Sequence, residues 1–316
     1  MRVEKIVVLG TGGTIAGTAA SVQDHLGYAA AQRGIDDLVA GIAGLHAQEL
    51  ELEQVAQIDS KDIDERIWSL LIDRCAHWLS KPQVRGVVVT HGTDTLEETA
   101  FLLQRVLAPD KPVVLTCAMR PATALMADGP QNLLDAVTAA RTAGVRGVLV
   151  VCAGKVHEAL HVRKRHTYAL DAFDSGERGP VAVVEDGALR PLSGWSDGGQ
   201  GADDALRKRL ARVQPWPWVE IVTSHAGARA GAVDALVAQG VRGLVVAGTG
   251  NGTVHHALLD ALLRAQDAGV RVVRATRCAQ GRVLPHQGDV LPHAAVPSPV
   301  KARIDLQLAL LAQGEA

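Results

Sequence analysis

The chain has 316 residues, of which 47% are hydrophobic, so it is long and apolar enough to bury the cores of two domains. Lys and Arg total 32 against 34 acidic residues, for a net charge of -2. This balance offers no electrostatic attraction for nucleic acid or for an anionic membrane, and we expect a small-molecule partner.

The N-terminal ten residues run into a strand-like stretch without the basic start, long apolar run and cleavage site of a signal peptide. We therefore expect a cytoplasmic protein. No apolar run approaches the roughly twenty residues that span a bilayer, so membrane insertion is not expected. The cysteines stand far apart in apolar segments, which predicts reduced, buried thiols at Cys75, Cys117, Cys152 and Cys278.

Short Val-rich runs alternate with helical patterns in the first part of the chain. The runs predict strands that are buried on both faces and paired in parallel, at residues 5–9, 86–90, 112–116 and 147–151. The helical patterns predict helices at residues 63–79, with Asp62 as N-cap, and at 96–107 and 131–143. This alternation predicts a doubly wound, mostly parallel α/β sheet.

A Gly-, Ser- and Asp-rich stretch at residues 186–200 interrupts the alternation and predicts the start of a linker. A second α/β pattern follows, with strands at 218–223, 243–247 and 270–275 and helices at 230–238, 254–268 and 301–311. We predict an N-terminal catalytic domain over residues 1–190, a linker over 191–213 and a smaller C-terminal domain over 214–316.

Ligands of parallel sheets bind beyond the carboxyl ends of the strands. The first strand ends in Gly10-Thr11-Gly12-Gly13-Thr14, where the glycines let a ligand approach the backbone and Thr14 presents a hydroxyl. Gly-rich turns of this kind also bind dinucleotides, and a cofactor-binding domain is the alternative. The sequence has no P-loop lysine, and the acidic residue expected after the second strand of such domains has no clear position.

Two further loops carry polar groups. His91-Gly92-Thr93-Asp94-Thr95 puts a hydroxyl and a carboxylate at a second strand end. These side chains could cap the following helix or serve in catalysis, and both roles are compatible because a helix N-terminus offers free N–H groups to an oxyanion. Asp59-Ser60-Lys61-Asp62 adds a third hydroxyl and a cation.

The run from Thr11 to Ala16, Thr-Gly-Gly-Thr-Ile-Ala, together with His-Gly-Thr-Asp-Thr, resembles the bacterial-type L-asparaginases of the asparaginase/glutaminase family. The resemblance extends to Ala118-Met119-Arg120-Pro121, Gly250-Asn251-Gly252 and Lys301-Ala302-Arg303. It implies a larger N-terminal doubly wound, flavodoxin-like sheet, a smaller C-terminal α/β domain, and hydrolysis of L-asparagine without a metal or cofactor.

The resemblance also assigns catalytic roles. It implies a nucleophile at Thr14 and a second threonine with its aspartate at Thr93 and Asp94. The base lysine falls on Lys164, in a stretch reading His-Val-Arg-Lys-Arg where the family has roughly Val-Thr-Lys; a solvated cationic surface is the alternative. The tyrosine of the family's mobile loop corresponds to Tyr28, for which ordinary loop packing is the alternative.

Substrate-binding residues follow in the same way. Ser60 would hold the α-carboxylate, Asp94 the α-ammonium, and backbone N–H groups near Gly13 and Gly92 the carboxylate and the oxyanion. Lys61 stands where a glutamine is often found and could pair with the carboxylate or with Asp59. The predicted substrate-binding set is Gly13, Asp59, Ser60, Lys61, Gly92, Ala118 and Asn251.

In relatives a neighbouring subunit completes the site, so the resemblance implies a homodimer or homotetramer in which Asn251 reaches its neighbour's site. The neighbour's acidic residue has no clear counterpart, and Asp289 is the candidate. A dual glutaminase-asparaginase and a non-catalytic amino-acid-binding relative are the competing functions.

Two histidine motifs raise the question of metal. His157-Glu158-Ala159-Leu160-His161 matches the His-Glu-x-x-His zinc pattern, which requires a helix. Because the segment follows a strand with little room for a helix, we do not predict zinc. Adjacent residues on a helix face different ways, so for His255-His256 we predict capping or interface packing.

Overall fold

The computed structural model describes residues 4–195, 201–296 and 298–314. The chain divides into two compact units, Met1–Ala202 and Asp203–Ala316. The predicted linker, 191–213, spans this division; its residues 196–200 lie outside the described residues, and its last part includes helix α5 (Asp204–Arg212).

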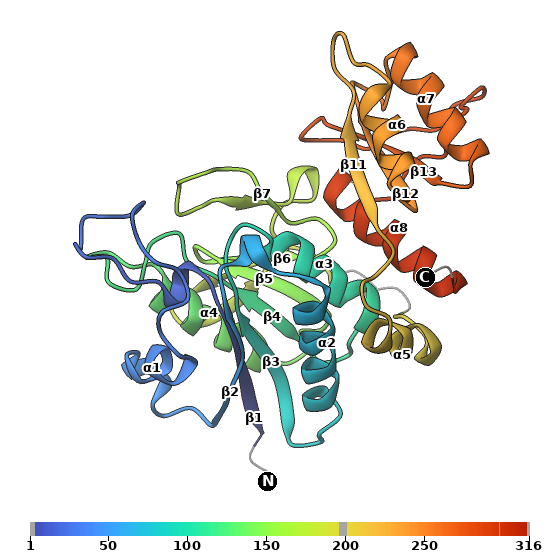
Figure 1. Cartoon of the computed structure of the whole chain (residues 1–316). Helices are drawn as coiled ribbons and strands as arrows, with labels where there is room; N and C mark the ends of the chain where they lie inside the picture. The colour runs from blue at the N-terminus through green and yellow to red at the C-terminus, as the bar shows by residue number, and fades with distance from the viewer. Residues whose placement is uncertain (1–3, 196–200, 297, 315–316) are drawn as a thin grey trace. The chain divides into compact units, whose positions relative to one another are not determined.

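The first unit is built on an eight-stranded sheet. The strands from β2 to β5 in the spatial order pair in parallel, and β6, β9 and β10 continue the sheet in antiparallel pairing. The prediction of a mostly parallel sheet is confirmed (Figure 1). In spatial order the strands are β10 (Ala188–Pro191), β9 (Ala182–Glu185), β6 (Lys155–Glu158), β5 (Val148–Cys152), β4 (Val113–Thr116), β3 (Val84–Thr90), β1 (Lys5–Gly12) and β2 (Leu50–Ile58).

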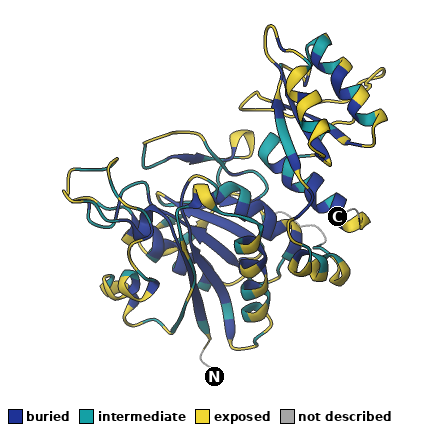
Figure 2. Cartoon of the chain, viewed as in Figure 1, coloured by how far each residue is buried: buried dark blue, intermediate teal, exposed yellow. Residues whose placement is uncertain are grey.

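Helices cover both faces of this sheet, as the doubly wound pattern predicts. Helices α1 (Ile35–Ala40) and α4 (Gly129–Arg141) pack with alternate residues of the central strands, among them Ile6 and Val8. Helices α2 (Glu65–Leu79) and α3 (Leu96–Leu107) contact the sheet and each other. Figure 2 shows the central strands buried and the outer helix faces exposed, which explains why these strands read as unbroken apolar runs.

Several details of the prediction are wrong. Helix α2 begins at Glu65, because Asp64 rather than Asp62 caps it by accepting from the backbone N of Arg66 and Ile67. Strand β2 was not predicted, because its half-buried residues alternate with charged and polar ones at the sheet edge. Cys278 is exposed, whereas the other cysteines are buried.

The second unit has a three-stranded parallel sheet, in the order β11 (Val219–Thr223), β12 (Gly243–Gly248) and β13 (Arg271–Thr276). Helix α8 (Pro299–Gln313) packs with Val219 and Val245 in one core cluster. Helices α6 (Gly231–Ala238) and α7 (His256–Asp267) pack with the alternate strand residues in another. The predicted smaller α/β domain is confirmed. Among the described residues, no helix is long and apolar enough to cross a membrane.

Candidate active site

The carboxyl ends of β1 and β3 touch at two glycines. Gly13 has φ +78, and a Cβ built there would lie 2.3 Å from the Cα of Gly92. A Cβ on Gly92 would in turn lie 2.4 Å from the Oγ of Ser60. Only glycine permits this close approach. It brings together Thr14 and Thr93, which follow the two glycines in the chain and are each 6% exposed.

We call Gly13, Thr14, Ser60, Gly92 and Thr93 the strand-end floor. Strand β1 lies between β2 and β3 in the sheet, so the segments that follow all three strands meet at one edge. The backbone N of Gly13 donates to the carbonyl of Ile58, the last residue of β2. The parallel register thus places hydroxyls from three separate motifs at one point.

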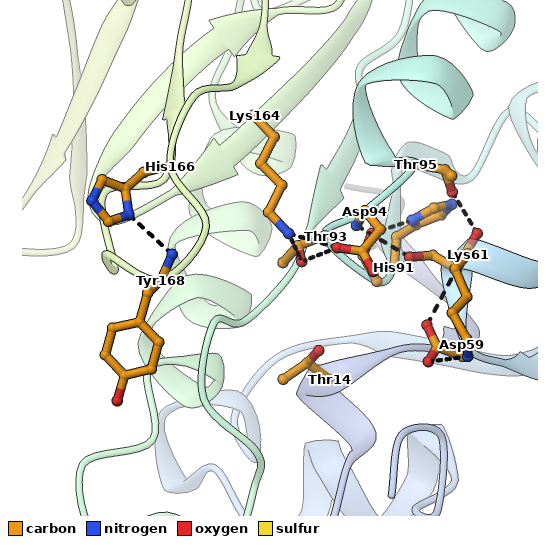
Figure 3. Close-up of polar contacts among 12 residues, drawn as sticks. Thr14, Asp59, Lys61, His91, Thr93, Asp94, Thr95, Lys164, His166 and Tyr168 are labelled. Carbon is orange, nitrogen blue, oxygen red and sulfur yellow. Dashed lines mark hydrogen bonds and ion pairs between the residues drawn. The ribbon is translucent and has the colours of Figure 1, made fainter. Parts of the chain in front are cut away.

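Lys164 reaches this floor from a distant part of the chain. Its Nζ donates to Thr93 Oγ1 at 2.8 Å and to Asp94 Oδ1 at 2.6 Å. Thr93 Oγ1 also faces Asp94 Oδ1, at 3.4 Å (Figure 3). The Lys164 side chain is 19% exposed, so the alternative of a solvated cationic surface is wrong for this residue.

Lys164 is carried by a short hairpin, formed by β7 (Arg163–Lys164) and β8 (Phe173–Asp174) over residues 163–174. Arg165 turns to the carboxylates of Asp171, at 3.5 Å, and Asp174, at 3.8 Å. Asp171 also accepts from Lys155 Nζ on β6 at 2.7 Å. These ion pairs attach the hairpin to the sheet and turn Arg165 away from the ion pair of Lys164 and Asp94.

Tyr28 comes from the segment after β1, residues 17–31, which we call the lid. Its hydroxyl lies 2.6 Å from Thr14 Oγ1. Thr18 and Ala29 exchange backbone hydrogen bonds, and the N of Ala31 donates to the carbonyl of Gly13. The lid therefore leaves the floor and returns to it, and Tyr28 contacts the Thr14 hydroxyl instead of serving only in loop packing.

Ser60 and Lys61 differ in what they contact. Ser60 is buried; its Oγ accepts from the N of Asp94 at 3.2 Å, and its carbonyl accepts from Thr95 Oγ1 at 2.8 Å. The Thr95 hydroxyl therefore does not cap α3. Lys61 Nζ is held by Asp59 at 2.7 Å and by Asp62 at 3.1 Å, and the hydrogen bond to Asp59 raises its pKa.

His91 is a site residue whose role the sequence did not reveal. It is fully buried, and burial lowers its pKa to about 4, so the ring is neutral at neutral pH. Its Nδ1 lies 2.7 Å from the carbonyl of Gly92 and acts as the donor in that contact. The ring thereby orients the peptide that joins Gly92 to Thr93. Its place at a buried strand end was the only sign of this role.

Ala118 and Asn251 complete the predicted set. Ala118 is buried just beyond β4 and packs with Ile15 and Ala16, directly after Thr14. Asn251 belongs to the second unit, where its amide exchanges two hydrogen bonds with the backbone of Leu284. Asp289 also lies in that unit, paired with Arg274.

The two histidine motifs lie in different local structures. Residues 157–161 form the end of β6 and a turn instead of a helix, and His157 Nδ1 lies 2.9 Å from Ser175 Oγ. His255 caps α7 by accepting from the N of Ala257. In the described part of the chain, no three His, Cys, Asp or Glu side chains are grouped so that they could hold a metal ion.

Family models match both units. Residues 5–194 match the model described as "Asparaginase, N-terminal", and residues 218–316 match "Glutaminase/Asparaginase C-terminal domain". The chain belongs to the asparaginase family. The predicted family, and with it the class of amidohydrolases, is confirmed.

Three relatives illustrate the extent of the similarity. L-asparaginase 2 of Bacillus subtilis (strain 168) is 36% identical over 96% of this chain and 82% of its own. The glutaminase-asparaginase of Pseudomonas fluorescens biotype A is 35% identical over 98% of this chain and 87% of its own. The crystal structure of a probable cytoplasmic L-asparaginase from Campylobacter jejuni superimposes with a TM-score of 0.88 at 34% identity, covering 99% of this chain and 98% of the other.

Proposed function

We propose that this asparaginase-family protein hydrolyses L-asparagine to L-aspartate and ammonia through an acyl-enzyme on Thr14. One observation carries the proposal: two threonine hydroxyls stand at touching strand ends, and each has its own proton-handling partner. Thr14 contacts the Tyr28 hydroxyl at 2.6 Å, and Thr93 contacts Lys164 Nζ at 2.8 Å. A hydroxyl nucleophile needs such a partner because it is almost fully protonated at neutral pH.

In the first step, Thr14 Oγ1 attacks the side-chain carbonyl of the substrate. The C–N bond breaks, the hydroxyl proton passes through Tyr28 or the Thr93 and Lys164 pair to the leaving nitrogen, and ammonia departs. The product is an ester between Thr14 and the aspartyl group. Backbone N–H groups near Gly13 and Gly92 stabilise the oxyanion that forms on the way.

In the second step, water attacks the ester. Thr93 orients this water, and the water's proton passes by way of Thr93 and Lys164 Nζ to Thr14 Oγ1. The C–O bond to Thr14 breaks, Thr14 regains its proton, and aspartate leaves. The 2.8 Å contact between Thr93 and Lys164 is within the range that proton transfer requires.

The substrate has an α-ammonium and an α-carboxylate, which require different binding partners. We assign its α-ammonium to Asp94, whose carboxylate lies beside the Lys164 ammonium. Ser60 and the floor N–H groups hold its α-carboxylate. Lys61 Nζ lies between the carboxylates of Asp59 and Asp62, which offset its positive charge next to Ser60.

A dual glutaminase-asparaginase is the second candidate. Relatives with either name match this chain at 34% to 36% identity, so similarity does not favour one over the other. The two substrates differ by one methylene, a difference that a pocket commonly discriminates by about 1–3 kcal/mol. The two paired threonines argue against a relative that only binds an amino acid.

Assembly and location are part of the same proposal. We propose a homodimer or homotetramer in which Asn251 of a neighbouring copy completes the site, with Asp289 as the acidic contribution from the same unit. We also propose a cytoplasmic location. The Campylobacter jejuni structure is named cytoplasmic, whereas a relative from Haemophilus influenzae is named periplasmic, so fractionation of the native host is the test.

Ammonia release from L-asparagine, L-glutamine and D-asparagine tests the activity, with no metal added. We expect rapid release from L-asparagine by the wild type, none by Thr14→Ala, and partial activity in Thr14→Ser, which keeps a hydroxyl. Absence of release from every substrate would overturn the proposal. Acid quenching during turnover, followed by mass spectrometry, locates the ester; an adduct on Thr93 alone would reverse the roles of the two threonines.

A further inference from the structure

The lid and the hairpin meet in a contact that the mechanism does not use. His25 Nδ1 lies 3.1 Å from the hydroxyl of Tyr168, and the two rings stack with centroids 6.5 Å apart at 30°. His25 stands three residues before Tyr28 on the lid, and Tyr168 four residues after Lys164 on the hairpin. The contact therefore joins the two segments that carry the proton-handling side chains.

The backbone at Tyr168 is held by the side chain of His166. The ring of His166 accepts hydrogen bonds from the backbone N of Tyr168 and of Ala169, both at 2.9 Å. Figure 3 shows the Lys164 side chain directed at Thr93 and the Tyr168 ring directed away from Lys164. The hairpin is attached to β6 through Lys155 and Asp171, and Tyr168, which is 53% exposed, presents its hydroxyl from the middle of the hairpin.

The lid is held more firmly before His25 than around it. The N of Ala19 donates to Thr123 Oγ1, and the N of Leu125 donates to the carbonyl of Val22. Asp24 closes a tight turn by accepting from the N of Leu26 and Gly27. Leu26 is 81% exposed, so the apolar residue at the tip packs against almost nothing. The cross-lid bonds between Thr18 and Ala29 lie nearer the floor. A segment with so few buried contacts opens at a low free-energy cost unless another contact ties it down.

We propose that His25 and Tyr168 form a latch that holds the lid closed and so keeps Tyr28 against Thr14. Both are positioning residues, since neither contacts the reacting groups. The substrate enters and the product leaves with the latch open, and catalysis takes place with it closed. The kinetic consequence rests on the proposed function, whereas closure of the lid does not.

Hydrogen–deuterium exchange of the full chain, read by mass spectrometry, measures the latch without any substrate. Tyr168→Phe removes only the hydroxyl, and His25→Ala removes the ring. We expect each to speed exchange of the 17–31 amides by about twofold to tenfold, as for the loss of one hydrogen bond, and to leave exchange in β1 unchanged. Gln23→Ala, an exposed change on the same lid, is the matched control. Equal lid exchange in all four proteins would overturn the latch.

Kinetics with L-asparagine then connect the latch to Tyr28. We expect Tyr168→Phe and His25→Ala to lower kcat/KM by about twofold to tenfold, and the double variant to fall no further, because both remove one contact. In a Tyr28→Phe background neither change should lower kcat further. Additive losses, or losses that persist without Tyr28, would overturn the positioning role. A wild type inactive on asparagine would refute the proposed function and leave the exchange result to decide the latch.

Discussion

The strand-end floor and the two segments that supply Tyr28 and Lys164 differ in what holds their side chains. The floor is buried and fixed by parallel register and by glycines that have no room for a Cβ. The lid and hairpin are held by hydrogen bonds and ion pairs among partly exposed groups, such as Arg165 with Asp171. The nucleophile thus belongs to the core, and the proton acceptors belong to loops whose position can change without unfolding the sheet.

Gly13→Ala tests the floor, and we expect it to have the largest effect on activity and stability. The added Cβ would meet the Gly92 backbone at 2.3 Å, in a left-handed conformation that alanine avoids. We expect loss of activity and a free energy of unfolding lower by about 3 kcal/mol, measured by urea denaturation. Gly231→Ala is the control, because no atom lies within 4 Å of its Cβ. Equal stability of the two variants would show that the glycine contact does not hold the floor.

Lys164→Met tests the loop side of the comparison. Removing the amino group should lower kcat by about a hundredfold to ten-thousandfold, as for the loss of a group that transfers protons. The melting temperature should stay close to that of the wild type, because Asp94 is half exposed and remains hydrated. Arg165→Met on the same hairpin should retain most activity. A large loss of stability in Lys164→Met would place Lys164 with the floor rather than with the loops.

Asp94→Asn probes the point where the two regions join. Asp94 follows the floor in the chain and bonds to the hairpin lysine. If it holds the substrate's ammonium, its loss should raise KM by about tenfold to a hundredfold with a small change in kcat. Asp62→Asn, which removes an exposed carboxylate near the floor, is the matched control. A collapsed kcat with an unchanged KM would assign Asp94 to proton transfer instead.

A buried histidine lies beside each region: His91 precedes Gly92 of the floor, and His157 on β6 contacts Ser175 just after the hairpin. Burial lowers the pKa of both histidines to about 4. The unfolded chain takes up these protons near pH 6.5, so stability falls as pH drops from there towards 4. Each histidine contributes a slope of up to about 1.4 kcal/mol per pH unit. His157→Gln should therefore lose stability less steeply than the wild type in urea titrations between pH 6.5 and 4.5. Parallel slopes would contradict the role of His157.

The sequence predicted the strands that are buried on both faces, because such strands read as unbroken apolar runs. Helix α3, at Leu96–Leu107, matched its pattern at both ends. The half-buried edge strand β2 and the antiparallel strands β6, β9 and β10 were missed. Their residues are partly polar, so their pairing depends on neighbours that are distant in the sequence. The cap of α2 was misplaced because Asp62 and Asp64 offer the same local signal, and only Asp64 contacts the helix N–H groups.

By itself the sequence determined that Thr14 and Thr93 stand at strand ends, because apolar runs and the turn residues after them are local properties. The resemblance pointed to Lys164 and Tyr28. From the sequence, a solvated cationic surface remained the alternative for Lys164, and ordinary loop packing the alternative for Tyr28. Only the tertiary structure decided that Lys164 and not Arg165 meets Thr93 and Asp94, that Tyr28 meets Thr14, and that His25 meets Tyr168. These contacts join residues up to 143 positions apart, and pairing over such distances is set by the closed sheet and its hairpin rather than by any local pattern.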